Sequence, residues 1–312
     1  MSEVTIRRLT HEGLSFSYQL LRAADPSIAP VLAIGGVLQG MNGWSVLRQH
    51  VLPFADLVSV DLPGAGDSTP LRPEQGMETM CEVVEALLDD LGVARVNLLG
   101  YSFGAAVAHR CAQRRPDRVV RLALGGVPVR ISDELTALWR RGAERMAADD
   151  AEGLVDVLME MFLCPQGRAP IRQRDIVHRL VRRMTLRAVN STAHGFATME
   201  RSVLENLDPT GRLDGVSTLV FCGEHDTISS AAEQRDFAAT IGDCRFAVIP
   251  EADHWVFMER RWEASDLVMR HFTGRPTTAL PYLLEDASLL PAPQERVAPL
   301  PAPQERAAAT AG

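Results

Sequence analysis

The feature that most constrains the fold is a serine between glycines, placed where a strand pattern changes into a helix pattern. The motif Gly100–Gly104 reads GYSFG; NLL precedes it as a strand and AAVAHRCAQ follows it as a helix. Such a turn is so tight that side chains at Gly100 and Gly104 would collide. The hydroxyl of Ser102 is then held at the strand tip, where helix N–H groups favour negative charge. The motif therefore predicts an α/β protein with a nucleophilic serine.

The rest of the chain repeats this alternation of strands and helices. An N-terminal hairpin is expected over 4–21, with its turn at His11, Glu12 and Gly13. The alternation of strands and helices predicts an α/β fold with a mostly parallel, doubly wound sheet and right-handed crossovers. The buried strands are expected at 31–34, 57–61, 96–99, 119–124, 217–222 and 245–249, and helices at 80–91, 103–114 and 262–272.

Three regions are expected from these patterns. Residues 1–130 and 213–275 form the core, and residues 131–212, where strands disappear, form an inserted helical lid. Residues 276–312 are expected to be a disordered tail rich in Pro and Ala, with the tandem repeat LPAPQER at Leu290–Arg296 and Leu300–Arg306. A segment of this composition buries too little apolar surface to offset its ordering entropy.

Charge and cysteine content exclude several classes of function. The net charge of -8 disfavours nucleic acid and anionic membranes as partners. All 32 basic residues are Arg, which removes Schiff-base and P-loop lysine chemistry. The five scattered cysteines favour neither disulfides nor zinc, so no metal or cofactor is expected. Without a signal peptide or an apolar span, we expect a cytoplasmic protein; its oligomeric state is not predicted.

A serine needs a base and an orienting acid to become a good nucleophile. Asp226 follows the apolar run TLVFCGEHD and His254 lies just beyond the next strand, so the order is Ser, Asp, His. We predict that Asp226 orients His254 and that His254 accepts the Ser102 proton. Alternatives are His225 as the base, and Asp133 or Asp253 as the acid.

An oxyanion hole and an acyl pocket complete the expected site. The backbone N–H of Phe103 and that of Val37 are the predicted donors, with Gly36 or Leu38 as the fallback for Val37. The lid carries apolar and thioether side chains that suit an acyl chain, although helices that cover a sheet need apolar faces in any case. The lid residues chosen as the substrate pocket are Trp139, Met161 and Phe162.

Together these motifs resemble the α/β-hydrolase superfamily. The resemblance rests on Gly35-Gly36 before Val37, DLPGAGDS from Asp61, GYSFG, GEHD and ADH, and spans about residues 15 to 275. Gly35 stands where the family more often has a histidine. A second, more limited resemblance is to acyltransferases that join 3-hydroxyacyl chains carried on acyl carrier protein into hydroxyalkanoyloxyalkanoate lipids. It rests on AAEQRDFAATIGDCRF, the lid length and the Pro- and Gln-rich tail.

The expected function is acyl transfer from an ester or thioester through an acyl-enzyme on Ser102. The resemblance implies that the enzyme could be a 3-hydroxyacyl thioester acyltransferase, with substrate delivered on acyl carrier protein or CoA and docked by lid arginines. The alternative is a carboxylesterase or thioesterase. A ligand-binding scaffold without catalysis is the alternative from another class, and halogen or peroxide chemistry at the same serine is not excluded by the spacing.

Overall fold

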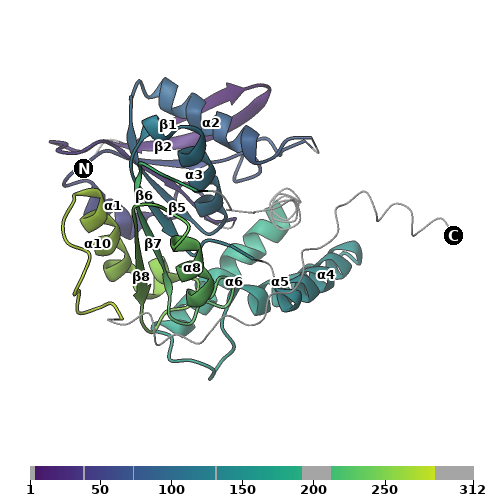
Figure 1. Cartoon of the computed structure of the whole chain (residues 1–312). Coiled ribbons are helices and arrows are strands. Elements are labelled where there is room, and N and C mark those ends of the chain that lie inside the picture. The colour runs from purple at the N-terminus through teal and green to yellow at the C-terminus, as the bar shows by residue number, and fades with distance from the viewer. Residues whose placement is uncertain (1–3, 38, 73, 131, 192–211, 285–312) are drawn as a thin grey trace.

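The computed structural model describes residues 4–37, 39–72, 74–130, 132–191 and 212–284, and builds them around one eight-stranded sheet (Figure 1). The strand order is β1-β2-β4-β3-β5-β6-β7-β8. β1 and β2 form the predicted hairpin, which turns at Glu12 and Gly13, both with positive φ. β2 also pairs antiparallel with β4, and all later neighbours are parallel. The strands are β1 (Val4–His11), β2 (Leu14–Leu21), β3 (Val31–Ile34), β4 (Leu57–Asp61), β5 (Val96–Tyr101), β6 (Val119–Gly125), β7 (Ser217–Gly223) and β8 (Cys244–Ile249).

Helices cover both faces of the sheet, which explains why every residue of β3 and β4 is buried, without alternation between the two faces. One apolar cluster joins α2 (Met77–Asp90), α3 (Phe103–Arg114) and α8 (Ala231–Ala238) to one face. A second joins α1 (Ser45–Val51) and α10 (Arg261–Phe272) to the other. The predicted α/β-hydrolase fold is confirmed. Among the described helices, none is both long and apolar enough to cross a bilayer.

In the described part of the chain between β6 and β7, residues 132–191 form three helices. They are α4 (Asp133–Ala147), α5 (Ala151–Phe162) and α6 (Arg174–Ser191). Apolar side chains of α4 and α5 form their own cluster, against which Val37 and Trp255 of the core also pack. We propose, following the sequence, that α4, α5 and α6 are the lid helices. The remainder of the expected lid, 192–211, lies outside the described residues.

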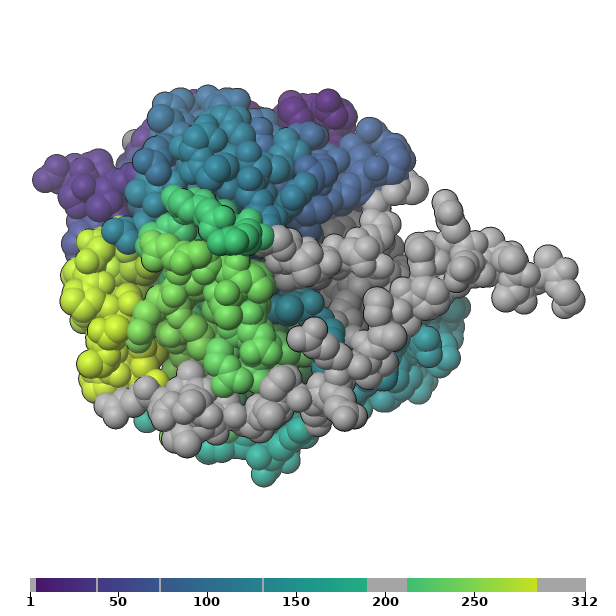
Figure 2. All heavy atoms as spheres, in the orientation of Figure 1, coloured from purple at the N-terminus to yellow at the C-terminus, as the bar shows by residue number. Residues whose placement is uncertain are grey.

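The C-terminal boundary of the core differs from the prediction. The tail was expected from residue 276, but Leu280 is buried in the cluster beneath α10. The Tyr282 hydroxyl donates to Asp266 at 2.5 Å, and the Leu284 N–H donates to the Val248 carbonyl at 3.1 Å. Residues 276–284 therefore pack on the core, because their apolar side chains cover α10. In Figure 2 the C-terminal part of the described chain, in yellow, lies directly against the green part that includes β7, α8 and β8. The rest of the predicted tail, with both LPAPQER copies, lies outside the described residues.

The short elements complete the described chain. A 3₁₀ turn, η1 (Pro116–Arg118), leads into β6, and α9 (Val256–Glu259) directly follows the loop that carries His254. The parallel strands β3, β5, β6, β7 and β8 all end at one edge of the sheet, so the loops that follow them meet there.

Candidate active site

Ser102 occupies a strained turn between β5 and α3. Its φ of 53° and ψ of -123° are unusual for a residue with a side chain, and its N–H is bound by the Gly125 carbonyl of β6 at 2.8 Å. A Cβ on Gly100 would lie 2.4 Å from the Gly104 carbonyl oxygen. A Cβ on Gly104 would lie 2.3 Å from the Ile34 carbonyl oxygen of β3. Both glycines are therefore needed, the first for the turn itself and the second for its packing on β3.

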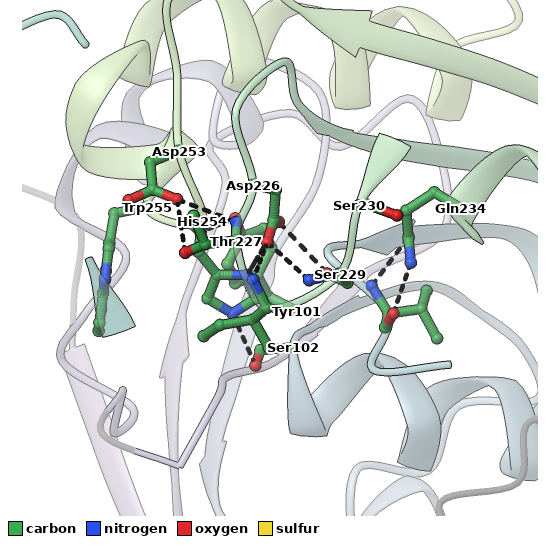
Figure 3. Close-up of polar contacts among 12 residues, drawn as sticks. Tyr101, Ser102, Asp226, Thr227, Ser229, Ser230, Gln234, Asp253, His254 and Trp255 are labelled. Carbon is green, nitrogen blue, oxygen red and sulfur yellow. Dashed lines mark hydrogen bonds and ion pairs between the residues drawn. The ribbon is translucent and has the colours of Figure 1, made fainter. Parts of the chain in front are cut away.

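The side chains of Ser102, His254 and Asp226 converge above this turn (Figure 3). The Oγ of Ser102 lies 2.9 Å from Nε2 of His254. Nδ1 of the same imidazole lies 2.9 Å from Oδ2 and 3.1 Å from Oδ1 of Asp226. The contacts join three loops that are far apart in the sequence, after β5, β7 and β8. A hydroxyl, an imidazole and a carboxylate thus form one hydrogen-bonded chain.

The Asp226 carboxylate is fixed by its own loop. Its Oδ1 accepts the N–H groups of Ile228 at 3.0 Å and Ser229 at 2.9 Å, and Ser229 Oγ lies 3.3 Å from Oδ2. Burial by itself lowers the pKa of His254, but the Asp226 charge and hydrogen bond, with the charge of Asp253, raise this pKa above its ordinary 6.5 overall. The imidazole is thereby prepared to accept a proton.

No described hydrogen bond joins the alternative base or acids to Ser102 or to the His254 ring. His225 has its Nε2 3.5 Å from Glu224 Oε2, and no described contact joins it to Ser102. Asp133 is exposed in the first turn of α4. Asp253 is buried beside His254, yet its carboxylate binds the backbone N–H groups of Cys164 and Thr227 instead of the imidazole.

The loop after β3 lies against Ser102, on the side expected for the oxyanion donors. A Cβ on Gly36 would lie 3.1 Å from Ser102 Cβ, so this glycine permits the close approach. Val37 and Phe103 line one small cavity together, and Gly36 and Val37 line a second one with Ser102. Leu38, the fallback donor, lies outside the described residues. The donor roles of the Val37 and Phe103 N–H groups remain predictions.

Asp61 holds this loop, a role that the sequence analysis missed. Its Oδ1 accepts the Met41 N–H at 2.6 Å, and Ser59 Oγ donates to the Met41 carbonyl at 2.8 Å. Glycines at 40 and 66 leave room for the carboxylate, since a Cβ at either would lie within 2.8 Å of its oxygens. Burial raises the pKa of Asp61 above its usual range. The DLPGAGDS motif was the available signal, because it placed this acid at a strand end.

The cavity at Ser102 is small and mostly apolar. Its volume is about 20 Å³, which is room for about one water molecule. Of the three residues expected in the substrate pocket, Phe162, at the end of α5, lines this cavity, whereas Trp139 and Met161 lie in the apolar cluster between α4 and α5. Among the described lining residues, His254 is the only titratable group besides Tyr101. The other described lining residues are Gly36, Val37, Gln39, Ser102 and Trp255.

Two neighbours of the converging side chains were also missed by the sequence analysis. The Tyr101 hydroxyl donates to the His254 carbonyl, and its ring packs on that of Phe257 with centroids 5.2 Å apart. The Trp255 indole N–H donates to the Phe162 carbonyl at 2.8 Å. Their adjacency to Ser102 and His254 in the sequence was the only signal.

A further carboxyl, Glu259, is buried behind the histidine loop. Its Oε2 accepts the Asp253 N–H at 2.7 Å. Burial, followed by the Asp253 charge, raises the pKa of Glu259 from 4.5 to about 8, although Arg174 lowers it in part. Glu259 is therefore protonated in the folded protein at neutral pH but ionised in the unfolded chain.

This difference predicts how stability depends on pH. Between about pH 4.5 and pH 8 the folded state binds the extra proton at Glu259, so the contribution of this group to stability falls as pH rises through that window. Glu259→Gln removes the titration and keeps an oxygen for the Asp253 N–H. We expect the difference in melting temperature, variant minus wild type, to be larger at about pH 9 than at about pH 5. An equal offset at both values, measured by scanning calorimetry, would contradict the prediction.

Among the described residues, one group could share a metal ion outside this site. Ligand atoms of His11, Glu12 and Glu82 lie within 4.8 Å of one another on the β1–β2 turn and α2. None of these three residues is among the described residues that line the cavity at Ser102.

The convergence of Ser102, His254 and Asp226 on this sheet defines a serine hydrolase of the α/β-hydrolase type. Residues 29–261 match the family model described as the alpha/beta hydrolase fold. The chain therefore belongs to the α/β-hydrolase fold family.

The proteins to which the chain is similar agree with this family membership. The chain is 26% identical over 255 residues to a 2-hydroxy-6-oxo-6-phenylhexa-2,4-dienoate hydrolase from Comamonas testosteroni, covering 76% of this chain and 83% of that protein. It is 25% identical to the dihydrolipoyllysine-residue acetyltransferase component of an acetoin cleaving system from Pseudomonas putida, covering 74% of this chain and only 60% of that longer protein. A hydrolase structure from Pseudomonas aeruginosa superposes with a TM-score of 0.70 at 23% identity, covering 86% of this chain and 98% of that one.

Proposed function

We propose that the protein hydrolyses an uncharged carboxylic ester through an acyl-enzyme on Ser102. The observation that carries this proposal is the continuous hydrogen-bonded chain from Ser102 Oγ through His254 to Asp226. His254 takes the hydroxyl proton as Oγ attacks the carbonyl carbon, and then gives it to the leaving alcohol. Water, deprotonated by the same imidazole, releases the acid and restores Ser102. Asp226 holds the tautomer whose Nε2 lone pair faces the serine.

The tetrahedral intermediate carries a negative oxygen that needs donors. We propose the backbone N–H groups of Val37 and Phe103, because both residues border the cavities beside Ser102. Phe103 begins α3, so its N–H points out of a helix N-terminus, where backbone dipoles favour an anion.

The cavity walls support an uncharged acyl group as the substrate class. The described residues that line the cavity at Ser102 and its neighbour beside Phe103 include no Arg, Asp or Glu. A charged acyl group would be desolvated there without a partner, which is costly. The similarity to the Comamonas hydrolase also favours water as the acceptor over a second acyl chain.

Transfer to a hydroxyl, including 3-hydroxyacyl thioester chemistry with a carrier protein, is the competing outcome. Two of the lid arginines that were expected to dock an acidic carrier are already paired. Arg141 binds Glu160 at 3.0 Å, and Arg182 binds Glu152 at 2.7 Å and Asp156 at 2.8 Å. These pairs support a solvated lid surface, although exposed pairs of this kind are individually weak.

Covalent labelling and product analysis test the proposal together. A fluorophosphonate should add its mass to Ser102 in the native protein, and p-nitrophenyl acetate and butyrate should be hydrolysed with release of the free acid. The same incubations with 3-hydroxyacyl thioesters and an added alcohol reveal any transfer product. Absence of label at Ser102 would overturn the proposed chemistry, and an acylated alcohol as the main product would replace hydrolysis by transfer.

The raised pKa of His254 predicts the pH profile. The base must be neutral to accept the serine proton, so kcat/KM should fall as pH drops through the pKa of His254. Because Asp226 and Asp253 raise that pKa overall, the acidic limb should have its midpoint above the 6.5 of an unperturbed histidine. Initial rates over a series of buffers at constant ionic strength measure the midpoint. A value below 6.5 would contradict the electrostatic account.

A further inference from the structure

The two residues that flank His254 both bind the same short stretch of chain, residues 162–164 at the end of α5. Figure 3 shows Asp253 and Trp255 beside the histidine. The Trp255 indole N–H donates to the Phe162 carbonyl at 2.8 Å, and the Cys164 N–H donates to the Asp253 carboxylate. We call these two hydrogen bonds the roof clamp. The clamp attaches the end of a lid helix to both sides of the histidine.

Asp253 also connects the clamp to the loop that carries Asp226. Its second carboxylate oxygen, Oδ1, lies 3.3 Å from the Thr227 backbone N and 3.4 Å from Thr227 Oγ1. Asp253 is 1% exposed, so these contacts are shielded from water. Three segments therefore meet at one buried carboxylate: the histidine loop, the aspartate loop and the end of α5. A buried carboxylate that lost one of these donors would be poorly satisfied.

The clamp lies over the reacting serine. Phe162 and Trp255 line the cavity at Ser102, and their rings meet edge to face with centroids 6.4 Å apart. The cavity volume of about 20 Å³ accommodates about one water, so an acyl chain much larger than a water molecule must displace part of this wall. Phe162 is the wall residue carried by the lid. Its backbone carbonyl accepts the hydrogen bond from Trp255, the residue next to His254, so a displacement of the Phe162 backbone would lengthen that bond.

We propose that Asp253 and Trp255 are positioning residues that couple the roof at Phe162 to His254, and that this roof clamp limits the length of the acyl group that the enzyme accepts. The inference rests on the proposed ester hydrolysis and deepens it by assigning the selectivity for short acyl chains to two particular hydrogen bonds. A tight roof keeps the imidazole aligned for small esters. Longer chains strain the clamp and disturb that alignment.

Two single variants test the clamp. Trp255→Phe keeps an aromatic ring but removes the N–H donor, and Asp253→Asn keeps the size of the side chain but replaces one acceptor oxygen with a donor. Each is assayed on p-nitrophenyl acetate and octanoate at a pH on the plateau of the rate profile. We expect kcat for the acetate to fall by roughly 10- to 100-fold, because a small displacement of a reacting group has an effect of this size. The octanoate-to-acetate ratio of kcat/KM should rise in both variants.

A residue far from the site provides the matched control. Trp262 is 48% exposed on α10, and Trp262→Phe makes the same chemical change without touching the clamp. We expect its rates and its selectivity ratio to equal those of the wild type. A lower melting temperature with an unchanged selectivity ratio in Trp255→Phe or Asp253→Asn would show a merely structural role and overturn the proposal.

Hydrogen exchange gives a readout that needs no substrate. In each clamp variant, amide exchange should rise together in peptides that cover residues 159–168 and 250–258. Faster exchange in the first peptide alone would overturn the coupling. The proposed function fails separately: it is refuted if the wild-type protein is not labelled by the fluorophosphonate at Ser102, whatever the exchange data show.

Discussion

Ser102→Ala is expected to lower kcat/KM for ester substrates by roughly 10³- to 10⁶-fold. The change removes the atom that forms the acyl-enzyme, and the rest of the hydrogen-bonded chain has no other nucleophile to activate. Steady-state rates with p-nitrophenyl butyrate, together with fluorophosphonate labelling, measure the effect.

The fold should survive this substitution. Ser102 sits at a φ of 53°, and alanine meets the same strain there because both residues carry a Cβ. The melting temperature should therefore stay close to that of the wild type. Ser17→Ala, on β2, makes the same change outside the site and should keep full activity. Retention of more than about a tenth of the activity by Ser102→Ala would contradict the assignment, because removing one member of a catalytic triad lowers the rate by much more than tenfold.

Ser102, Asp226 and His254 could be predicted because each of them lies in, or directly after, a recognisable local sequence pattern. Ser102 lies in a motif whose glycines have a steric purpose, and Asp226 and His254 each follow an apolar strand. Parallel strands end at the same edge of a sheet, so residues that directly follow β5, β7 and β8 have to lie near one another. This topology brings the three loops together without any long-range sequence signal, and the contacts of 2.9 Å form where they meet.

The contacts that support the site were not predictable in this way. The hydrogen bond from Tyr101 to the His254 carbonyl spans 153 positions, and that from Cys164 to Asp253 spans 89. Both depend on loop conformations, which leave no periodic pattern in a sequence. Asp61 was visible within a motif, yet its partner Met41 lies in a loop whose path only the folded chain defines.

The residues of α4 and α5 show the same limit. Their buried apolar residues recur at helical spacing, but that spacing does not tell a substrate contact from packing between two helices. Phe162 reaches the cavity at Ser102 because it ends α5, whereas Trp139 and Met161, from the same apolar faces, fill the space between the helices. At the C-terminus, the prolines suggested a tail from residue 276, while Leu280 and Tyr282 pack on the core.

Asp226→Asn is expected to reduce kcat by about 10⁴-fold, through the tautomer of His254 and not through loss of the fold. The geometry decides which way the new amide points. Oδ1 of Asp226 accepts two backbone N–H groups, from Ile228 and Ser229, so the amide oxygen must keep that place. The NH2 group then occupies the position of Oδ2, 2.9 Å from His254 Nδ1.

An NH2 group at that position donates to Nδ1, which places the imidazole proton on Nε2, facing Ser102 Oγ. His254 then cannot accept the serine proton, although every side chain keeps its place. The pKa of His254 should also fall, because the Asp226 charge and hydrogen bond help to raise it, so the acidic limb of the residual activity moves to lower pH. Asp133→Asn makes the same change at the exposed start of α4 and should leave both kcat and the pH profile unchanged. A fall of less than tenfold in Asp226→Asn, or an equal loss in Asp133→Asn, would show that the carboxylate at 226 does not orient the base.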